Sequence, residues 1–360
     1  MKIILSGGGT LGPVVPLLAI AEKYRRVHPE TEFVWVGTKT GAEKELVESY
    51  KIPFFTINAG KWRRYFSLMN IVDMIKVFFA FWQSLFLIWH EKPDLLITAG
   101  GFVSVPLHLA GATLGVPAWV HQQDLRLGLA NRLMAITAKK ITVALRDSLE
   151  CFSVKKTEWL GNPVRDLDHP DLMVARQKFN LLPDAPIILA LGGGTGSARI
   201  NKMVLEAMPN WPQNWQIIHL TGKTRPHELS DRAGALFPNY HPYQFLTTDM
   251  KDAYALAEVV IARAGFATIT EAASLSKALV LVPISGTHQE DNANLLDKNN
   301  AAVVLDERTD DGLKLAQVVK ELMELPEKRQ NLGVRLKTVL PPAKPERIVA
   351  IIEELTKKQA

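Results

Sequence analysis

Cysteine is almost absent from this sequence. Cys151 is the only one in 360 residues, so the chain cannot form an internal disulfide and cannot build a cysteine-based metal site. A single thiol agrees with a reducing cytosol. The N-terminus also lacks the basic, apolar and small-residue pattern of a secretory signal peptide, because residues 2–6 already read as a strand. We therefore expect a cytoplasmic protein.

The sequence also lacks a large net charge and any nucleic-acid-binding motif. The net charge is only +5, a mild excess that fits an anionic substrate or an anionic membrane surface. Zinc-finger spacing and RNA-binding signatures are missing, so we expect no nucleic-acid partner. Hydrophobic residues make up 47% and charged residues 22%, which allows well-buried cores, and the length suits two domains.

The sequence does contain one pattern twice. Residues 3–10 read I-I-L-S-G-G-G-T, and residues 187–195 read I-I-L-A-L-G-G-G-T. Each is an apolar run followed by a glycine cluster and a helix-like stretch, as in a buried strand that turns into a helix N-terminus. Glycine allows close backbone approach to a ligand, and a helix N-terminus attracts phosphate. The repeat predicts an α/β chain of two Rossmann-like domains whose parallel sheets face a central cleft.

The remaining periodicity supports this architecture, because strand-like and helix-like segments alternate. Gly161, Asn162, Pro163 and Pro170 mark a connection, so we expect an N-terminal domain at 1–160 and a C-terminal domain at 161–340. A last helix at 345–358 is expected to pack back on the first domain. The expected strands are 2–6, 32–37, 95–99, 118–121, 140–143, 187–191, 216–220, 243–246, 259–262, 278–282 and 302–305. The expected helices of the first half are 14–27, 41–50, 68–91, 104–114 and 128–137.

Residues 68–90 form an apolar stretch nearly long enough to span a bilayer. Asp73, Lys76 and Gln83 interrupt it, and both flanks belong to the predicted sheet, so a membrane-spanning helix is disfavoured. It holds too many large apolar residues for one buried stripe. We expect it to dock on an anionic membrane surface, and a fully buried helix or a dimer contact is the alternative. The predicted membrane patch consists of Trp62, Arg63, Arg64, Phe78, Phe79, Trp82 and Phe86.

Two polar segments of the second half follow predicted strands. In 263–271, Thr268 and Glu271 have the spacing of a helix capping box, which is a structural role. Alternatively, this helix N-terminus binds a phosphate while Glu271 binds ribose hydroxyls. The segment 288–293 reads H-Q-E-D-N-A. Its amides and carboxylates fit sugar hydroxyls, and the alternative is a solvated loop with a helix cap.

Together and in order, these segments resemble the MurG family of bacterial glycosyltransferases, which add N-acetylglucosamine to lipid I in peptidoglycan synthesis. The G-N-P-V-R segment matches the family's linker motif unchanged, and H-Q-Q-D resembles its H-E-Q-N. The resemblance runs along nearly the whole chain. The segments that carry it are 7–22, 100–106 (G-G-F-V-S-V-P), 121–124, 161–165, 193–199 (G-G-T-G-S-A-R), 263–271 and 288–293.

The resemblance implies a GT-B fold and an inverting hexosyltransferase that moves N-acetylglucosamine from UDP-N-acetylglucosamine to the muramyl sugar of lipid I, making lipid II. It also implies an undecaprenyl-diphosphate-linked muramyl-peptide acceptor at the inner face of the cell membrane, with no essential cofactor. Matching motif by motif, the expected contacts are Arg165 and Thr195 on the diphosphate, the backbone of Phe266, Ala267, Thr268, Ile269 and Thr270 on the phosphates, Leu246 on uracil, Glu271 on ribose, Gln289 and Asn292 on the sugar, and Thr10, Leu11 and Gly12 on the acceptor side.

Three departures fall on the acceptor side. Pro13 occupies the position of a family histidine favoured as the general base, Leu11 replaces a glycine, and Asp124 replaces an asparagine. One hypothesis makes Asp124 the base, with His121 as a second candidate. Asp166-Leu167-Asp168 looks like a D-x-D metal motif, but its position in the linker favours chance.

Other readings stay open. They are a GT-B transferase with a different acceptor, UDP-sugar 2-epimerase chemistry on the same architecture, and a non-catalytic UDP-sugar binder. An NAD-dependent oxidoreductase ranks low, because neither glycine loop combines a convincing G-x-G-x-x-G with an acid about twenty residues on at a strand end.

Overall fold

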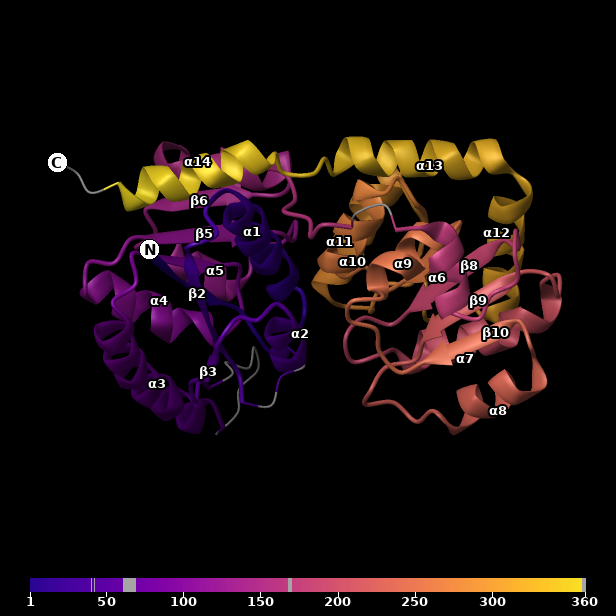
Figure 1. Cartoon of the computed structure of the whole chain (residues 1–360), viewed down its shortest axis with the longest axis horizontal. Coiled ribbons are helices and arrows are strands. Elements are labelled where there is room, and N and C mark those ends of the chain that lie inside the picture. The colour runs from indigo at the N-terminus through magenta and orange to yellow at the C-terminus, as the bar shows by residue number, and fades with distance from the viewer. Residues whose placement is uncertain (40, 42, 61–68, 168–169, 358–360) are drawn as a thin grey trace. The chain divides into compact units, whose positions relative to one another are not determined.

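The structure of the chain, a computed structural model, describes residues 1–39, 41, 43–60, 69–167 and 170–357. The chain divides into two compact units (Figure 1). The first unit is Met1–Asp166 together with Ala343–Ala360, and the second is Leu167–Pro342. Each unit has its own parallel sheet, as the repeated strand–glycine–helix pattern predicts.

The described residues of the first unit build a parallel sheet in the order β3-β2-β1-β4-β5-β6-β7. Its two central strands contain uninterrupted runs of Ile and Leu, at residues 3–5 and 95–97, with no polar alternation, which is typical of strands covered by helices on both faces. The strands are β1 (Lys2–Ser6), β2 (Glu32–Gly37), β3 (Phe54–Thr56), β4 (Leu95–Thr98), β5 (Ala118–Gln122), β6 (Lys140–Val143) and β7 (Thr157–Trp159).

Helices cover this sheet and include one from the far end of the chain. Helix α14 (Pro345–Thr356) packs against α1 (Val14–Val27). The Arg347 guanidinium donates to both carboxylate oxygens of Glu158, at 2.8 and 2.6 Å, and so ties α14 to β7. The other helices of this unit are α2 (Glu43–Ser49), α3 (Met69–Glu91), α4 (Ser104–Thr113), α5 (Leu129–Met134) and the 3-10 turns η1 (Arg146–Cys151) and η2 (Val154–Lys156).

The second unit repeats this plan, with strand order β10-β9-β8-β11-β12-β13 in its described residues. The strands are β8 (Ile187–Leu191), β9 (Gln216–Leu220), β10 (Tyr240–Tyr243), β11 (Val259–Ala262), β12 (Ala278–Leu281) and β13 (Val303–Val304). The helices are α6 (Leu172–Lys178), α7 (Ala198–Ala207), η3 (Met208–Asn210), α8 (Glu228–Leu236), α9 (Met250–Leu256), α10 (Phe266–Ser274), α11 (His288–Lys298), α12 (Gly312–Glu324) and α13 (Pro326–Val339).

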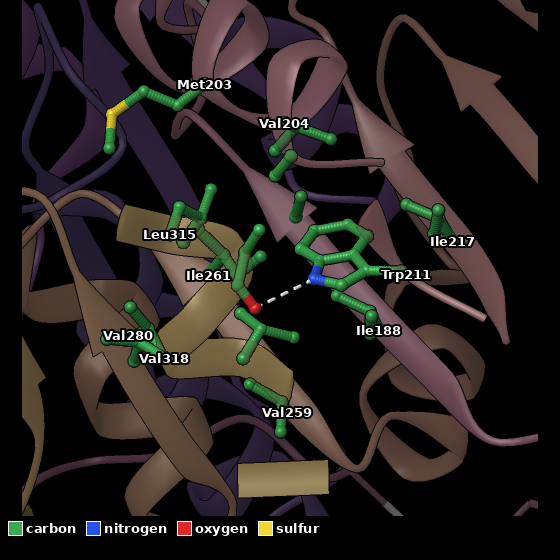
Figure 2. Close-up of a cluster of buried hydrophobic side chains, with 14 of the residues drawn as sticks. Ile188, Met203, Val204, Trp211, Ile217, Val259, Ile261, Val280, Leu315 and Val318 are labelled. Carbon is green, nitrogen blue, oxygen red and sulfur yellow. Dashed lines mark hydrogen bonds between the residues drawn. The ribbon is translucent and has the colours of Figure 1, made fainter. Parts of the chain in front are cut away.

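Figure 2 shows one side of the second unit's core, where strand residues such as Ile188 and Ile261 meet Leu315 of α12. Trp211 lies among them, and its indole nitrogen donates to the Ala316 carbonyl at 3.2 Å. The buried ring therefore has its one polar group satisfied. This packing holds β8 and β11 side by side, which positions the loops at their carboxyl ends.

Most strands lie where the sequence predicts them, and the exceptions are edge strands. The strand expected at 243–246 is wrong, because β10 is Tyr240–Tyr243. Pro242 lies inside it, which an edge strand tolerates because one side of its backbone needs no sheet partner. β3 and β7 were not expected and are short, at 3 residues each. The hydrophobic pattern is too brief in such segments to predict a strand.

Candidate functional site

Each sheet reverses its strand order at one point, and glycine loops follow the two strands there. In the first unit these strands are β1 and β4, and in the second unit they are β8 and β11. In open parallel sheets, ligands bind outside the carboxyl ends of strands at such a reversal. The glycine loops singled out in the sequence therefore lie where the fold favours binding.

The two glycine loops of the first unit are packed against each other. A Cβ atom on Gly101 would lie 2.9 Å from the Gly8 carbonyl oxygen, so only glycine fits there. Gly101 also has a φ of +89°, which favours glycine independently. Ser104 donates to the backbone oxygens of Ser6 and Gly100, both at 2.9 Å, which locks the second loop to the end of β1.

A buried carboxylate lies behind the first glycine loop. Glu43 is fully buried, and its Oε1 accepts hydrogen bonds from the backbone and side chain of Thr38. The Gly9 N–H also points at this oxygen, at 3.4 Å. Glu43 was missed in the sequence, where it reads as an ordinary acidic residue in a first helical turn. A loop that binds phosphate needs positive potential, and the negative charge of Glu43 lowers the potential at this loop.

The expected acceptor loop has no proton-transferring side chain at its helix start. Thr10 is exposed, and Leu11 and Gly12 are half-buried. The Leu11 carbonyl accepts from the Val14 N–H at 3.1 Å. Pro13 is the N-cap of α1 with φ −67° and ψ −13°, and it makes no side-chain cap. The backbone geometry at this position therefore suits proline, and the proline side chain has no group that can accept a proton.

His121 and Asp124, the two base candidates, lie in different surroundings. His121 is fully buried, and burial lowers its pKa to about 3, so its imidazole is neutral. Its Nδ1 lies 2.8 Å from Thr142 Oγ1. This burial argues against His121 as the base, since a substrate hydroxyl cannot reach it. Asp124 is half-buried just after β5, and its carbonyl accepts from Gln122 Nε2 at 2.7 Å.

The third glycine loop, at 192–197, begins the second unit's site. Gly193 and Gly196 have φ values of +79° and +74°, and the Gly196 N–H closes the turn on the Gly193 carbonyl at 3.0 Å. Ser197 caps α7, because its hydroxyl accepts from the Ile200 N–H at 3.2 Å. Thr195 is exposed at the top of this turn, as a diphosphate contact requires.

Arg263 joins this loop to the neighbouring strand ends. Its Nε donates to Ser197 Oγ at 2.9 Å, and its Nη1 donates to the Val282 carbonyl at 2.9 Å. The same nitrogen contacts Glu307 at 2.6 Å, and Glu307 accepts the Ser285 N–H at 2.8 Å. One side chain thus connects the loops after β8, β11, β12 and β13. Glu307 is a second residue that sequence reasoning missed.

The N-terminus of α10 is uncapped by side chains in the described structure. Its N-cap is Gly265, and Thr268 lies inside the helix, so the capping box expected from Thr268 and Glu271 does not form. Glycine at the N-cap leaves the first backbone N–H groups, at Phe266 and Ala267, open to an anion. Thr268, Ile269 and Thr270 follow in the same helix, and Glu271 is buried with 4% of its surface exposed.

Helix α11 brings the expected sugar contacts beside this helix start. Its N-cap is Thr287, whose hydroxyl accepts from the Gln289 N–H at 3.2 Å. The Gln289 side chain accepts the Ile284 N–H at 3.2 Å. Asn292 is buried and donates to the Ala264 carbonyl at 3.1 Å, which fixes the loop before α10. Leu246, the expected uracil contact, is half-buried beyond the end of β10.

The remaining expected site residue, Arg165, and the D-x-D-like segment are on the chain between the two sheets. Arg165 belongs to the first unit, whereas the remaining donor-site residues belong to the second. Asp168 is outside the described residues, and Asp166 faces α1, with its carboxylate near Lys23 at 3.8 Å and paired with Arg26. Among the described residues, no group of three or more His, Cys, Asp or Glu side chains has metal-binding geometry.

The expected membrane patch is described only in part. Trp62, Arg63 and Arg64 lie outside the described residues. On α3, the polar side chains Asp73 and Ser84 are buried, while large apolar ones face outward. No helix in the described part of the chain is long and apolar enough to cross a membrane. The exposed apolar residues of α3 are Met74, Ile75, Phe78, Phe79, Trp82, Phe86 and Trp89, each with more than half of its surface accessible.

Comparison with known proteins assigns the family. The N-terminal domain model of glycosyltransferase family 28 matches residues 3–143, and its C-terminal domain model matches residues 187–337. The chain belongs to glycosyltransferase family 28. The two models cover the two glycine-loop sheets separately, and this agrees with the predicted α/β architecture of two Rossmann-like domains.

Individual proteins are similar to this chain along most of its length. A Clostridium perfringens protein named UDP-N-acetylglucosamine--N-acetylmuramyl-(pentapeptide) pyrophosphoryl-undecaprenol N-acetylglucosamine transferase is 33% identical over 336 residues, 92% of each chain. A Listeria monocytogenes protein of the same name is 32% identical over 313 residues, 85% of this chain and 86% of the other. The resemblance to the MurG family read from the motifs is thereby confirmed.

Solved structures agree with this assignment. The crystal structure of Acinetobacter baumannii MurG has a TM-score of 0.72 and 25% identity, covering 98% of this chain and 99% of the other. A Neisseria meningitidis UDP-GlcNAc 2-epimerase, solved with UDP-GlcNAc bound, has a TM-score of 0.66 at 16% identity, covering 99% of each chain. At that identity the likeness shows the fold alone. The expected GT-B fold is confirmed.

Proposed function

We propose that this chain transfers N-acetylglucosamine from UDP-N-acetylglucosamine to the muramyl sugar of an undecaprenyl-diphosphate-linked acceptor, making lipid II. The observation that supports this most is the arrangement at the second unit's strand reversal. There Arg263 ties the third glycine loop to the strand end that precedes the uncapped N-terminus of α10. Two anion-attracting backbone elements side by side suit a diphosphate.

In this proposal the second unit binds the donor. The Thr195 hydroxyl and the first N–H groups of α10 disperse the negative charge of the departing UDP, which lowers the barrier to its departure. Glu271 binds the ribose hydroxyls, Leu246 the uracil, and Gln289 with Asn292 the N-acetylglucosamine. None of these roles calls for an essential cofactor, and a rate that survives a chelator would agree.

We assign the general base to Asp124 in the same proposal. An inverting transfer needs a group that removes the proton of the attacking sugar hydroxyl. Pro13 cannot do so, and His121 is sealed in the core with a pKa of about 3. Asp124 follows β5 at the carboxyl edge of the first unit's sheet, near the end where its glycine loops lie.

Replacing Asp124 with asparagine tests this role. We expect Asp124→Asn to lower kcat by roughly a hundredfold or more, the size of a typical general-base contribution, with KM for the donor unchanged. An unchanged kcat would refute the assignment.

The α3 surface supports a place at the inner face of the membrane. Phe86 and Trp89 are 68% and 66% exposed, and a soluble surface rarely gathers so many large apolar side chains. Phe86→Ser with Trp89→Ser should weaken binding to vesicles of anionic lipid severalfold. A matched control is Leu229→Ser with Leu236→Ser on α8, where both leucines are at least 70% exposed. Equal loss in the two double variants would contradict docking through α3.

The decisive assay is UDP release from UDP-N-acetylglucosamine, with and without a short-chain lipid I analogue. Acceptor-dependent release is the expected result. A second candidate function, UDP-sugar binding without transfer, is favoured by Pro13 at the base position. Tight UDP binding without acceptor-dependent release would support that candidate against the transferase.

A further inference from the structure

A loop outside the recognised motifs, which we call the backing loop, packs against the third glycine loop. Residues 222–225 follow β9, and the approach is close enough that a Cβ on Gly196 would lie 2.6 Å from the Gly222 Cα. Gly222 has a φ of +95°, so glycine is required on both sides of the contact. The two loops therefore form one packed unit, although Gly196 and Gly222 are 26 positions apart in the sequence.

This backing loop hydrogen-bonds the carbonyl groups of the glycine loop. The Thr224 hydroxyl donates to the Thr195 carbonyl at 2.9 Å, and Arg225 Nε donates to the Gly196 carbonyl at 3.3 Å. A loop that binds phosphate must present N–H groups to the ligand, so its carbonyls need donors elsewhere. Thr224 and Arg225 supply such donors.

Arg225 also differs from Arg263 in its charge balance. Arg263 pairs with the Glu307 carboxylate at 2.6 Å. Within the described residues, no carboxylate pairs with Arg225, whose side chain is exposed. A guanidinium left unneutralised beside a glycine loop raises the potential felt by an anion there.

We propose that Arg225 is a positioning residue for the diphosphate of the nucleotide-sugar donor. It holds the third glycine loop through the Gly196 carbonyl and contributes positive charge to the loop's anion site. This inference rests on the proposed function for its ligand, a nucleoside diphosphate. It goes further by naming a residue that the donor motifs do not include.

The test compares UDP with UMP in binding titrations of the full chain. Arg225→Ala should weaken UDP about tenfold and UMP by a smaller factor, because the lost charge acts on the phosphates. Arg225→Lys should restore part of the UDP affinity, and Arg225→Gln, which keeps a donor without charge, should restore less. Raising the salt concentration should shrink the difference between wild type and Arg225→Ala.

The control is Arg232→Ala, an exposed arginine on α8, which should bind UDP like wild type. Equal losses for UDP and UMP, or no loss in Arg225→Ala, would overturn the inference while leaving the proposed function standing. A wild-type chain that binds no UDP would overturn both. UDP binding that depends on Arg225 without any transfer to a lipid acceptor would sustain the inference and refute the transferase.

Discussion

The first and third glycine loops carry the same G-G-G-T sequence but lie in opposite electrostatic surroundings. Behind the first loop, the buried Glu43 carboxylate accepts from Gly9. Behind the third, Arg225 donates to Gly196, and Arg263 reaches the capping serine, Ser197. The helix after the first loop begins at a proline without a side-chain cap.

The difference teaches that a glycine pattern fixes the shape of a loop without deciding its ligand. Both loops turn a strand into a helix, and both need glycine at positive φ, at Gly9 and at Gly193. Charge placed by other segments then separates them. The third loop is suited to a diphosphate, whereas a phosphate at the first loop would meet the Glu43 anion.

The largest expected effect on donor binding comes from Gly196→Ala. A Cβ there would lie 2.3 Å from the Thr221 carbonyl oxygen, and the φ of +74° alone costs an alanine about 1–2 kcal/mol. UDP affinity measured by calorimetry should fall roughly a hundredfold or more. The matched change in the first loop is Gly9→Ala, where φ is +85° and a Cβ would lie 2.9 Å from the Phe102 ring. If Gly9→Ala weakened UDP as much, the contrast between the loops would be wrong.

Next in size is the Arg263–Glu307 pair, whose side chains are 12% and 19% exposed. Arg263→Ala should destabilise the chain by about 3 kcal/mol, because it leaves a carboxylate largely buried and unpaired. UDP affinity should fall about tenfold, since the third loop loses its tie to β11. Thermal unfolding and titration with UDP measure the two effects. If Arg263→Ala lowered stability but left UDP affinity unaltered, the pair would have no part in UDP binding.

The same pair predicts a pH dependence. Burial raises the pKa of Glu307, but the Ser285 N–H and the Arg263 guanidinium outweigh it and hold the pKa below its usual 4.5. A carboxyl group whose pKa is lower in the folded state than in the unfolded state stabilises the fold at pH values above its unfolded-state pKa. This stabilisation is lost as the pH falls through the folded-state pKa. Stability should therefore decline below about pH 4.5 less steeply in Glu307→Gln than in wild type. Identical slopes would refute this.

A smaller effect is expected from Ser197→Ala. The change removes the cap on the Ile200 N–H and the acceptor for Arg263 Nε, which should cost about 1 kcal/mol in unfolding free energy. Chemical denaturation gives this value, and UDP affinity should fall only severalfold. Ser197→Thr keeps a hydroxyl acceptor and serves as the control. A loss as large as that of Gly196→Ala would mean that the cap outweighs the loop geometry.

The smallest effect on donor binding belongs to Glu43→Gln. The amide oxygen can still accept from Thr38, and only the charge behind the first loop is lost. UDP affinity should stay within about twofold of wild type, because the anion site that we propose for the donor lies at the third loop. Markedly tighter UDP binding in this variant would indicate that the first loop binds the diphosphate against the repulsion of Glu43.

The sequence predicted the central strands and both glycine loops, because uninterrupted apolar runs ending in glycine leave few alternatives. It could not predict β10 correctly, since Pro242 lies inside that edge strand. It also missed Glu43, Arg225 and Glu307. Each acts through a tertiary contact between segments distant in sequence, and no local spacing reports such a contact. The expected capping box failed for the related reason that the helix begins at Phe266, ahead of Thr268.

Hydrogen exchange of backbone amides with and without UDP tests most directly whether the third glycine loop, and not the first, binds the diphosphate. Saturating UDP should slow exchange at residues 193–201 and at the start of α10, where the N–H groups would bind the diphosphate. Residues 7–14, around the first glycine loop, should exchange at the same rate in both samples. Protection of residues 7–14 without protection of 193–201 would contradict the account.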